Sequence, residues 1–313
     1  MIRRLVIAGA AVALLAGCTS TATPVGQARA VAPSASPSGP AAAADDSCHP
    51  RESLRPTGTL PAPGKMPAGS LMAKIYQRGR LILGTSQDTL LFSSRNAFTG
   101  KVDGFDVDMG RQIAQAIFGD PNKLQIKVIA YDQRVPLAQS GQVDLVADTM
   151  TMNCARWKSV NFSTVYYDAG QRVLVSSAST AKSMDDLGGK KVCAAVGSTS
   201  LDNIKAYASK PIAVGRPGFA DCLVAFQLNQ VDAISTDDTI LAGLAAQDPY
   251  AKVVGDAFTK EPYGLAMPKD DQFTRFVNAV LEQNRQNGTW TKTYNKWLGR
   301  FGAPPPPPKA EYR

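Results

Sequence analysis

The chain has 313 residues, enough for two compact domains, and its 44% hydrophobic and 19% charged content is ordinary for a globular protein. Lys and Arg number 34 against 26 Asp and Glu, which gives a formal net charge of +8 without any block of basic residues. This pattern does not indicate nucleic-acid binding, and it favours anionic solutes or a membrane surface only weakly.

The N-terminus has the pattern of an export signal. Arg3 and Arg4 precede an apolar run over residues 5–16, which is too short to span a bilayer. The run leads into Leu-Ala-Gly-Cys18, which resembles the bacterial lipobox, whose cysteine becomes the lipidated N-terminus. An ordinary secretory signal with a chance cysteine is the alternative. We expect residues 1–18 to be a lipoprotein signal peptide, with lipid on Cys18 anchoring the protein outside the cytoplasmic membrane.

Apart from Cys18, the chain contains four cysteines: Cys48, Cys154, Cys193 and Cys222. An even number in an exported protein predicts two disulfides, for which three pairings are possible. We favour Cys193–Cys222, which would join a strand to a nearby following helix, and Cys48–Cys154, which would pin an N-terminal arm to a loop. The chain has no Cys-x-x-Cys spacing and a single histidine, His49, so we expect neither a metal site nor a cofactor.

Residues 19–69 show no domain pattern. Up to about residue 44 they are mainly Ala, Pro, Ser, Gly and Thr, which cannot bury a core and predict a disordered tether. From Cys48 the sequence stays rich in proline, and we expect an irregular arm that its disulfide holds to the surface. The globular part then begins near Ser70.

Alternating strand and helix patterns from residue 70 onward predict two α/β units. In the first unit we expect helices at 71–78, 107–118 and 133–139 and strands at 81–83, 124–129 and 143–147. In the second we expect strands at 192–196, 212–214 and 232–235, each followed by a helix. Helices at 273–284 and 290–298 come last, and the five prolines at 304–308 predict a polyproline spur.

The C-terminal helices decide how the two units are arranged. If they pack back on the first unit, residues 70–172 and 256–300 form lobe one and residues 173–255 form lobe two, with residues 301–313 left as a Pro-rich tail. The chain would then cross between the lobes twice. A hinged design of this kind can close on a ligand.

Residues 143–156 join a buried strand to polar groups. The apolar run over residues 143–147 is followed by Thr149 and Thr151, whose spacing of two would place both hydroxyls on one side of an extended chain. Arg156 follows five residues later. Open α/β sheets bind ligands at the carboxyl ends of their strands, and the guanidinium fork of arginine suits a carboxylate. The alternative is a surface turn whose arginine forms an exposed ion pair.

Several motifs occur in a fixed order: Gly104-Phe105-Asp106-Val107-Asp108, the stretch that ends in Arg156, Asn161-Phe162-Ser163 with Tyr166-Tyr167, and Val231-Asp232-Ala233 with Asp237. Over about residues 80–298 this series resembles the family 3 extracellular solute-binding proteins, the amino-acid receptors of ABC importers. The lipobox, tether and four cysteines are similar to those of actinobacterial glutamine/glutamate-binding lipoproteins. The resemblance implies an α/β fold of the class II periplasmic-binding-protein type, in which two α/β lobes joined by a two-strand hinge bind the ligand between them.

The same resemblance implies roles for individual residues. Arg156 would bind the α-carboxylate of an amino acid, assisted by the hydroxyl of Thr151 and by polar groups at Thr149. Asp237 would bind the α-ammonium, although capping of the following helix is its alternative role. Its neighbour Asp238 does not match the register of the family.

Further residues would complete the cleft. Ser198 and Thr199 precede a helix and would offer N–H groups and hydroxyls to the carboxylate, or they would simply cap that helix. Tyr131 would flank the ligand, although a core tyrosine would show the same pattern. The facing loop, where relatives often have an aromatic or basic residue, has Ser86 and Thr89 instead, and this departure weakens any transfer of side-chain specificity.

Arg134 bears on the identity of the ligand. It lies three residues after Tyr131 in an Arg-Val-Pro-Leu run that resembles the glutamate/aspartate receptors, where an arginine in this register meets the side-chain carboxylate. An exposed surface arginine is the alternative. If Arg134 lines the cleft, two arginines against Asp237 favour a dicarboxylic amino acid over a neutral one.

Together, these expectations describe a lipid-anchored, monomeric, extracytoplasmic receptor that delivers its ligand to an ABC permease. The expected ligand is glutamate or aspartate, with asparagine and glutamine as alternatives. An amino-acid sensor that engages a transmembrane receptor is the second reading. A dehydratase of small acids on the same fold is the third. It is disfavoured because the only histidine lies in the arm and no catalytic triad can be assembled. Glu261, near the predicted hinge, is the one candidate carboxylate for such chemistry.

Overall fold

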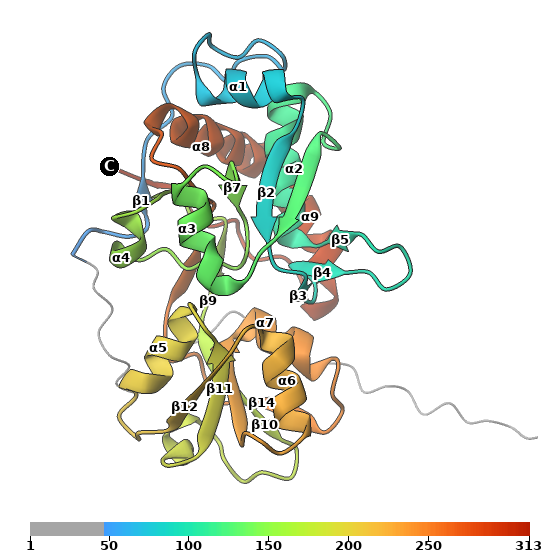
Figure 1. The fold of residues 1–313 in the computed structure, drawn as a ribbon, viewed down its shortest axis with the longest axis vertical. Coiled ribbons are helices and arrows are strands. Elements are labelled where there is room, and N and C mark those ends of the chain that lie inside the picture. The colour runs from blue at the N-terminus through green and yellow to red at the C-terminus, as the bar shows by residue number, and fades with distance from the viewer. Residues whose placement is uncertain (1–46) are drawn as a thin grey trace, which may run out of the picture.

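The structure is a computed structural model that describes residues 47–313. Two lobes lie one above the other, each built on a five-stranded sheet (Figure 1). The expected signal peptide with Cys18 and most of the expected tether lie outside the described residues. Among the helices of residues 47–313, none combines the length and the apolar character needed to cross a membrane.

Lobe one has a mixed sheet whose strands follow the spatial order β6-β2-β7-β16-β8. The strands are β2 (Leu81–Thr85), β6 (Leu124–Val128), β7 (Leu145–Val146), β8 (Asn161–Phe162) and β16 (Ala266–Met267). Strand β2 runs parallel to β6 and β7, whereas β16 runs antiparallel to β7 and β8. Because β16 comes after lobe two in the chain, its position between β7 and β8 ties the returning segment into the first sheet.

Helices cover both faces of the lobe-one sheet. The helices are α1 (Leu71–Arg78), α2 (Phe105–Phe118), α3 (Arg134–Gln139), α8 (Asp271–Gln286) and α9 (Thr289–Leu298). Residues of α1, α2, α8 and α9 share one core with Leu145, whereas Ala138 of α3 shares another core with Val146. Successive residues of β7 thus enter different cores, as alternation along a strand requires. The C-terminal helices pack back on lobe one, so lobe two is inserted into it.

In helix α8, the sequence determines both where the helix begins and which face is buried. The side chain of Asp270 caps it by accepting a hydrogen bond from the N–H of Phe273 at 2.8 Å. Its apolar residues recur at spacings of three and four and enter the lobe-one core: Phe273, Phe276, Val277, Val280 and Leu281. Burying each such side chain contributes about 1.5–3 kcal/mol, which holds the returning segment on lobe one.

Lobe two has the strand order β12-β11-β13-β10-β14. Its strands are β10 (Gln171–Ser176), β11 (Lys191–Ala195), β12 (Ile212–Arg216), β13 (Ala233–Asp237) and β14 (Ala251–Val254), and its helices are α5 (Thr199–Ala206), α6 (Phe219–Gln227) and α7 (Asp238–Ala245). Strand β11 runs parallel to β12 and β13, whereas β10 runs antiparallel to β13 and β14. The Cys193–Cys222 disulfide links β11 to α6 inside the core of this lobe.

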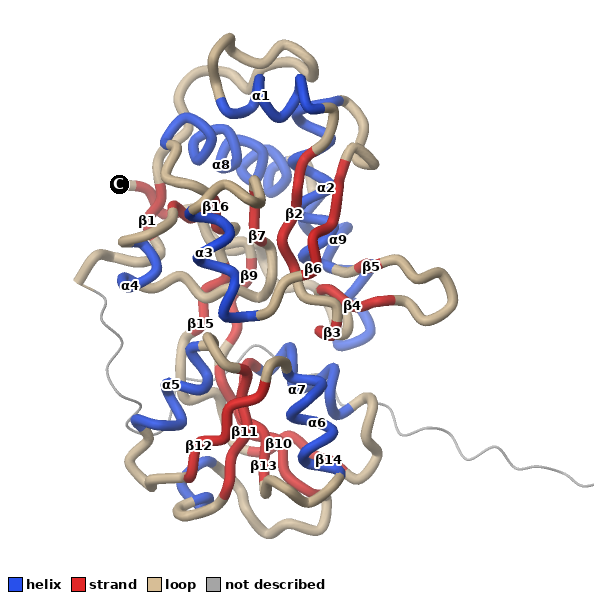
Figure 2. The backbone as a smooth tube through the Cα atoms, viewed as in Figure 1, coloured by secondary structure: helices blue, strands red, loops and turns tan. Residues whose placement is uncertain are grey.

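Two strands connect the lobes. Strands β9 (Tyr167–Ala169) and β15 (Glu261–Tyr263) run antiparallel and lie between the two sheets (Figure 2). The chain enters lobe two through β9 and returns through β15. The fold is therefore the expected class II type, with two α/β lobes and a two-strand hinge.

Several short elements had no counterpart in the sequence patterns. A small antiparallel sheet is formed by β3 (Asp88–Thr89), β4 (Ser93–Arg95) and β5 (Val102–Asp103), and strand β14 forms the edge of the lobe-two sheet. The remaining short helices are η1 (Tyr131–Gln133), α4 (Cys154–Trp157), η2 (Met184–Leu187) and η3 (Gly299–Phe301). Elements of two to five residues are too short for an apolar period to show.

The C-terminal tail does not form the expected spur. Strand β17 (Glu311–Tyr312) pairs in parallel with β1 (Glu52–Ser53) of the N-terminal arm, and Pro308 is buried. The prolines end early enough for the residues after them to donate backbone hydrogen bonds, including one from the N–H of Arg313 to the carbonyl of Ser53 at 3.0 Å. The expected Cys48–Cys154 disulfide is present and joins this arm to α4.

Candidate functional site

Two arginines of lobe one reach the same atom of lobe two. Nη2 of Arg134 and Nη2 of Arg156 each donate a hydrogen bond to the carbonyl oxygen of Gly197, both at 3.1 Å. Gly197 lies in the turn between β11 and α5, and its φ of +80° is in the region that favours glycine. A Cβ atom at this position would lie 2.6 Å from Cα of Asp132 in lobe one. The lobes are thus closed on one another at this point.

Arg134 lies at the interface between the lobes. Only 2% of it is exposed, so the alternative of an exposed surface arginine is wrong. Its Nε donates to the carbonyl of Tyr131 and its Nη1 to the carbonyl of Asp148, both at 2.9 Å. These bonds fix the guanidinium where lobe one faces Gly197.

Arg156 extends from α4, a single helical turn. The side chain of Asn153 caps this turn by accepting a hydrogen bond from the N–H of Arg156 at 2.8 Å. Nη1 of Arg156 donates to the carbonyl of Thr151 at 2.6 Å. Burial, followed by the charge of Arg134, lowers the pKa of Arg156 to about 9, so it stays charged at neutral pH.

Neither cleft arginine has a carboxylate partner. Among residues 47–313, the ion pairs within 4.0 Å include neither Arg134 nor Arg156, and both guanidiniums bond only to backbone carbonyls. Two converging cations that lack an anionic partner form a site suited to an anion, because a carboxylate accepts parallel hydrogen bonds from such a fork.

The stretch after β7 is not extended, and the expectation that Thr149 and Thr151 share one side of a strand is wrong. Thr149 has a φ of +44°. Its N–H donates to Oδ2 of the buried Asp106 at 2.7 Å, which draws the backbone out of the strand. The hydroxyl of Thr149 is buried and has no partner in the part of the chain that the structure describes, whereas that of Thr151 donates to Oε2 of Glu261 at 2.6 Å.

Glu261 connects both lobes at the hinge, a role that the sequence reasoning missed. Its Oε2 accepts hydrogen bonds from the hydroxyls of Thr151 in lobe one, at 2.6 Å, and Thr199 in lobe two, at 3.0 Å. Its Oε1 accepts from Nδ2 of Asn203 at 3.2 Å and from the hydroxyl of Thr259 at 2.8 Å. The hydroxyls of Thr151 and Thr199, both assigned to the ligand, are therefore held beside one another by this carboxylate.

Asp237 is the last residue of β13, and one of its oxygens has no hydrogen-bond partner among residues 47–313. Its Oδ2 accepts a hydrogen bond from the hydroxyl of Tyr263 at 2.5 Å, and its buried Oδ1 has no partner. It occupies the N-cap position of α7, but its side chain makes no capping bond. Burial, followed by the charge of Glu261, raises the pKa of Asp237 well above its usual range. A bound cation would give Oδ1 a partner and would lower the pKa of Asp237 again.

Unpartnered polar atoms gather at the carboxyl ends of the strands. Within the described chain, five buried side-chain atoms lack a hydrogen-bond partner: Thr85 Oγ1, Asp148 Oδ2, Thr149 Oγ1, Asp237 Oδ1 and Arg285 Nη1. The first four lie at or just after the ends of β2, β7 and β13. Proteins rarely leave such atoms unpaired, so the four are candidates to bind a polar ligand.

Asp148 is the most informative residue that the sequence reasoning passed over. Its Oδ1 accepts a hydrogen bond from the N–H of Ser86 at 2.8 Å, while its Oδ2 has no partner within the described residues. Burial raises the pKa of Asp148 to about 6, and the charge of Arg134 opposes this rise. The only signal in the sequence was an acidic residue directly after a predicted buried strand, and acidic residues are mostly exposed in proteins.

Tyr131, Ser86 and Thr89 form a hydroxyl chain on the lobe-one side of the cleft. The hydroxyl of Thr89 lies 2.6 Å from that of Tyr131 and 3.1 Å from that of Ser86. The ring of Tyr131 packs edge-on against Phe219 of lobe two, with 5.1 Å between centroids. Tyr131 therefore lies at the interface between the lobes, with the Arg134 guanidinium 4.7 Å from its ring centroid.

Ser198 performs the capping role that was its alternative. Its hydroxyl donates to the carbonyl of Ala195 at 2.6 Å and accepts from the N–H of Leu201 at 3.2 Å, which caps α5. The single hydroxyl hydrogen of Ser198 is thus engaged within lobe two. Its contact with a ligand stays a prediction, as do the ligand contacts of the other cleft residues.

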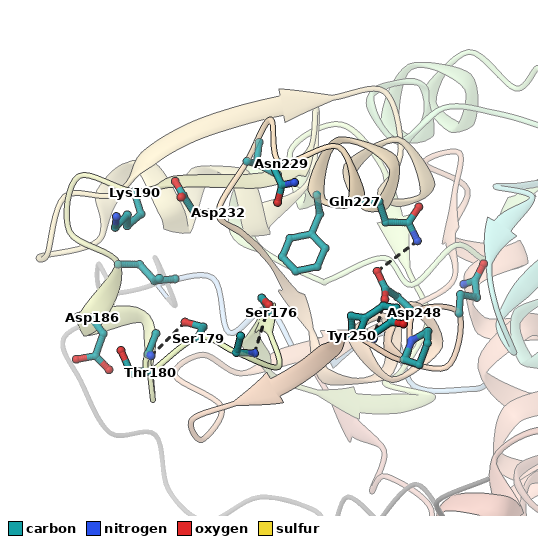
Figure 3. A pocket seen from close by; sticks show the side chains of 17 residues that line it. Ser176, Ser179, Thr180, Asp186, Lys190, Gln227, Asn229, Asp232, Asp248 and Tyr250 are labelled. Atoms are coloured by element: carbon teal, nitrogen blue, oxygen red, sulfur yellow. Dashed lines mark hydrogen bonds between the residues drawn. The ribbon is translucent and has the colours of Figure 1, made fainter. Parts of the chain in front are cut away.

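A separate hollow in lobe two does not belong to this cleft. It has a volume of about 950 Å³ and is lined by Ser176, Asp186, Lys190, Asp232, Asp248 and Tyr250, among others (Figure 3). Lys190 and Asp232 directly precede β11 and β13, so the hollow lies at the amino ends of these strands. Open α/β sheets bind ligands at the opposite, carboxyl ends, where Gly197 and Asp237 lie.

The chain is similar in sequence to known solute-binding proteins. The bacterial extracellular solute-binding proteins of family 3 match residues 81–300. The ABC transporter glutamine-binding protein GlnH of Bacillus subtilis (strain 168) is 37% identical over 229 residues, 72% of this chain and 84% of that protein. The glutamine-binding protein of Geobacillus stearothermophilus is 40% identical over 200 residues, 64% of this chain and 76% of its own length.

Solved structures agree with this match. An ancestral arginine-binding protein, bound to arginine in one structure and to glutamine in another, is 33% identical to this chain, with a TM-score of 0.66 for each. The alignment covers 71% of this chain and 99% of that protein. Residues 81–300, which the family matches, include all the residues between the lobes described above.

Proposed function

This chain belongs to family 3 of the bacterial extracellular solute-binding proteins, and we propose that it binds a polar amino acid between its lobes and presents it to an ABC importer. The observation that carries the proposal is the pairing of two arginines that lack an anionic partner with the unpartnered Oδ1 of Asp237. An amino acid carries the two complementary charges on its carboxylate and its ammonium group, which are both bonded to the α-carbon.

In this proposal the α-carboxylate binds to Arg156, with Thr199 and Thr151 at the same end of the cleft. The α-ammonium binds to Oδ1 of Asp237, with the free hydroxyl of Thr149 as a further acceptor. Each charge-assisted hydrogen bond contributes about 1.5–3 kcal/mol, and micromolar binding corresponds to about −8 kcal/mol.

Glutamate or aspartate is the first candidate ligand. The support is the position of Arg134, which is buried and bonds to Gly197 beside Arg156. Two guanidiniums are available to bind carboxylates, whereas only Asp237 is assigned to the ammonium. This balance of charges favours a ligand with a second carboxylate. Tyr131, Ser86 and Thr89 would form the wall next to the ligand's side chain.

Glutamine or asparagine is the second candidate, and the free Oδ2 of Asp148 favours it. A carboxamide can accept a hydrogen bond from Arg134 and donate one to Asp148, whereas an ionised carboxylate cannot donate. Two of the relatives are named as glutamine-binding, and the ancestral arginine-binding protein has been solved with glutamine bound.

The cellular arrangement extends the proposal. The lipobox at Cys18 supports a lipid anchor on the outer side of the cytoplasmic membrane, with the monomeric receptor on a tether. An ABC permease would recognise the closed form. A transmembrane sensor would recognise the same form, and co-purification of the membrane partner separates the two.

Calorimetry of the purified protein against the twenty amino acids tests this function. The proposal expects micromolar or tighter binding of one of the four candidates. Absence of binding to every amino acid contradicts the receptor, and preference for an apolar amino acid contradicts the role of Arg134 alone.

A further inference from the structure

Both ends of the described chain meet at the helix that carries Arg156. Helix α4 has only four residues, and a single turn is not stable by itself. The disulfide from Cys48 holds Cys154, its first residue. Nε1 of Trp157, its last residue, donates to the carbonyl of Pro50 at 2.8 Å, and the Arg313 guanidinium lies 4.2 Å from the centroid of a Trp157 ring.

The arm and the tail that make these contacts are joined to each other. Besides the pairing of β1 with β17, the guanidinium of Arg55 lies 4.6 Å from the ring centroid of Tyr312. Ser53 is fully buried, and its hydroxyl donates to the carbonyl of Phe162 in lobe one at 2.6 Å. We call residues 48–55 and 309–313 together the terminal clasp.

The terminal clasp also touches the hinge. Arg51 forms an ion pair with Asp168 of β9 at 2.6 Å and another with Glu311 of β17 at 2.8 Å. Both acids are about half exposed, so these ion pairs add little stability. Their consequence is geometric, because they hold the arm between the tail and the hinge strand.

We propose that the terminal clasp positions Arg156 for the ligand's carboxylate, so that the Cys48–Cys154 disulfide and Trp157 are positioning residues of the binding site. This inference rests on the proposed role of Arg156. The guanidinium is anchored at its tip by the carbonyls of Thr151 and Gly197, and the clasp anchors the backbone from which it extends. Binding groups must be held within about 0.5 Å of their productive position, which a free single turn cannot ensure.

A disulfide that only stabilises the fold should not affect binding of the ligand's carboxylate, and the second disulfide of the chain serves as this control. Cys193–Cys222 lies in the core of lobe two and contacts neither α4 nor the arm. We expect removal of either disulfide to lower thermal stability. Only removal of Cys48–Cys154 should weaken the contact with the ligand's carboxylate.

The test measures the affinity ratio between the amino acid that the wild-type protein binds best and its α-amide, which lacks the carboxylate. In the Cys48→Ser/Cys154→Ser variant we expect the amino acid to bind about tenfold more weakly, or worse, with the α-amide almost unaffected, since one lost charge-assisted bond has this effect. In the Cys193→Ser/Cys222→Ser variant the ratio should stay at the wild-type value. Trp157→Phe, which keeps a ring but loses the bond to Pro50, should lower the ratio less and serves if the double variant does not fold.

Two outcomes would overturn the inference in distinguishable ways. An unchanged ratio in folded Cys48→Ser/Cys154→Ser and Trp157→Phe variants, with a lowered melting temperature, would make the clasp purely structural and leave the receptor function intact. Equal binding of the amino acid and its α-amide by the wild-type protein would refute the carboxylate role of Arg156, and the clasp inference with it.

Discussion

Arg134 and Arg156 share one acceptor, because each donates a hydrogen bond of 3.1 Å to the carbonyl oxygen of Gly197. Like charges at such close range repel, and a neutral carbonyl compensates them only in part. A carboxylate between the lobes would compensate both. This relationship links closure of the lobes to anion binding.

Arg156→Lys should weaken binding of every amino acid by about tenfold to a hundredfold. Lysine keeps the charge but cannot form the two parallel hydrogen bonds of the guanidinium fork, and each such bond contributes about 1.5–3 kcal/mol. Calorimetry measures the loss. Arg172→Lys is the matched control, because Arg172 bonds to the Gly255 carbonyl within lobe two. Equal losses in both variants would refute the assignment.

Arg134→Gln should change selectivity more than overall affinity. If Arg134 binds a second carboxylate, the variant should lose about tenfold in its preference for glutamate over glutamine, the effect of one charge-assisted bond. Asp148→Ala should change the preference in the opposite direction, because it removes the acceptor for a carboxamide. Competition titrations measure both ratios. A wild-type preference that survives both substitutions would show that neither residue selects the ligand.

Ligand binding should release a proton from Asp237. In the closed lobes without a ligand, burial and the charge of Glu261 raise the pKa of Asp237, and a bound ammonium would lower it again. Affinity should therefore rise as the pH rises through that raised pKa, because the ammonium pairs with the ionised form. Calorimetry at one pH in two buffers of different ionisation enthalpy detects the proton. Identical heats in both buffers, or proton release retained in Asp237→Asn, would be inconsistent with this role.

Gly197→Ala should prevent full closure. The added Cβ would lie 2.6 Å from Cα of Asp132, so the lobes would have to separate. Gly189→Ala provides the control, because Gly189 also has a positive φ, of +69°, but no atom within 4 Å of its Cβ position. Both variants incur a backbone cost of about 1–2 kcal/mol. Small-angle scattering should show ligand-induced compaction in Gly189→Ala alone, and compaction in Gly197→Ala would contradict this account of the interface.

The longer helices and strands could be predicted from the sequence. Helix α1 spans the predicted residues 71–78, and in the structure Ser70 caps its first turn and Gly79 ends it. Met72 and Ile75, which are three residues apart, are buried. Such signals are local, and they survive in a single sequence because capping and apolar spacing act over a few residues.

Contacts between distant segments could not be predicted. Thr151 and Glu261 are 110 positions apart in the chain, and their hydrogen bond exists because the hinge brings β15 beside the end of β7. The free oxygen of Asp148 becomes informative only when its burial is known. The C-terminal tail was predicted to project because proline runs do so, but the five residues after the prolines decided its path.

The most direct test is a crystal structure of the complex with the amino acid that binds best. We expect closed lobes, with the ligand's α-carboxylate within hydrogen-bond distance of the Arg156 guanidinium and its ammonium at Oδ1 of Asp237. A ligand bound in the lobe-two hollow, or one whose carboxylate lies away from Arg156, would contradict it.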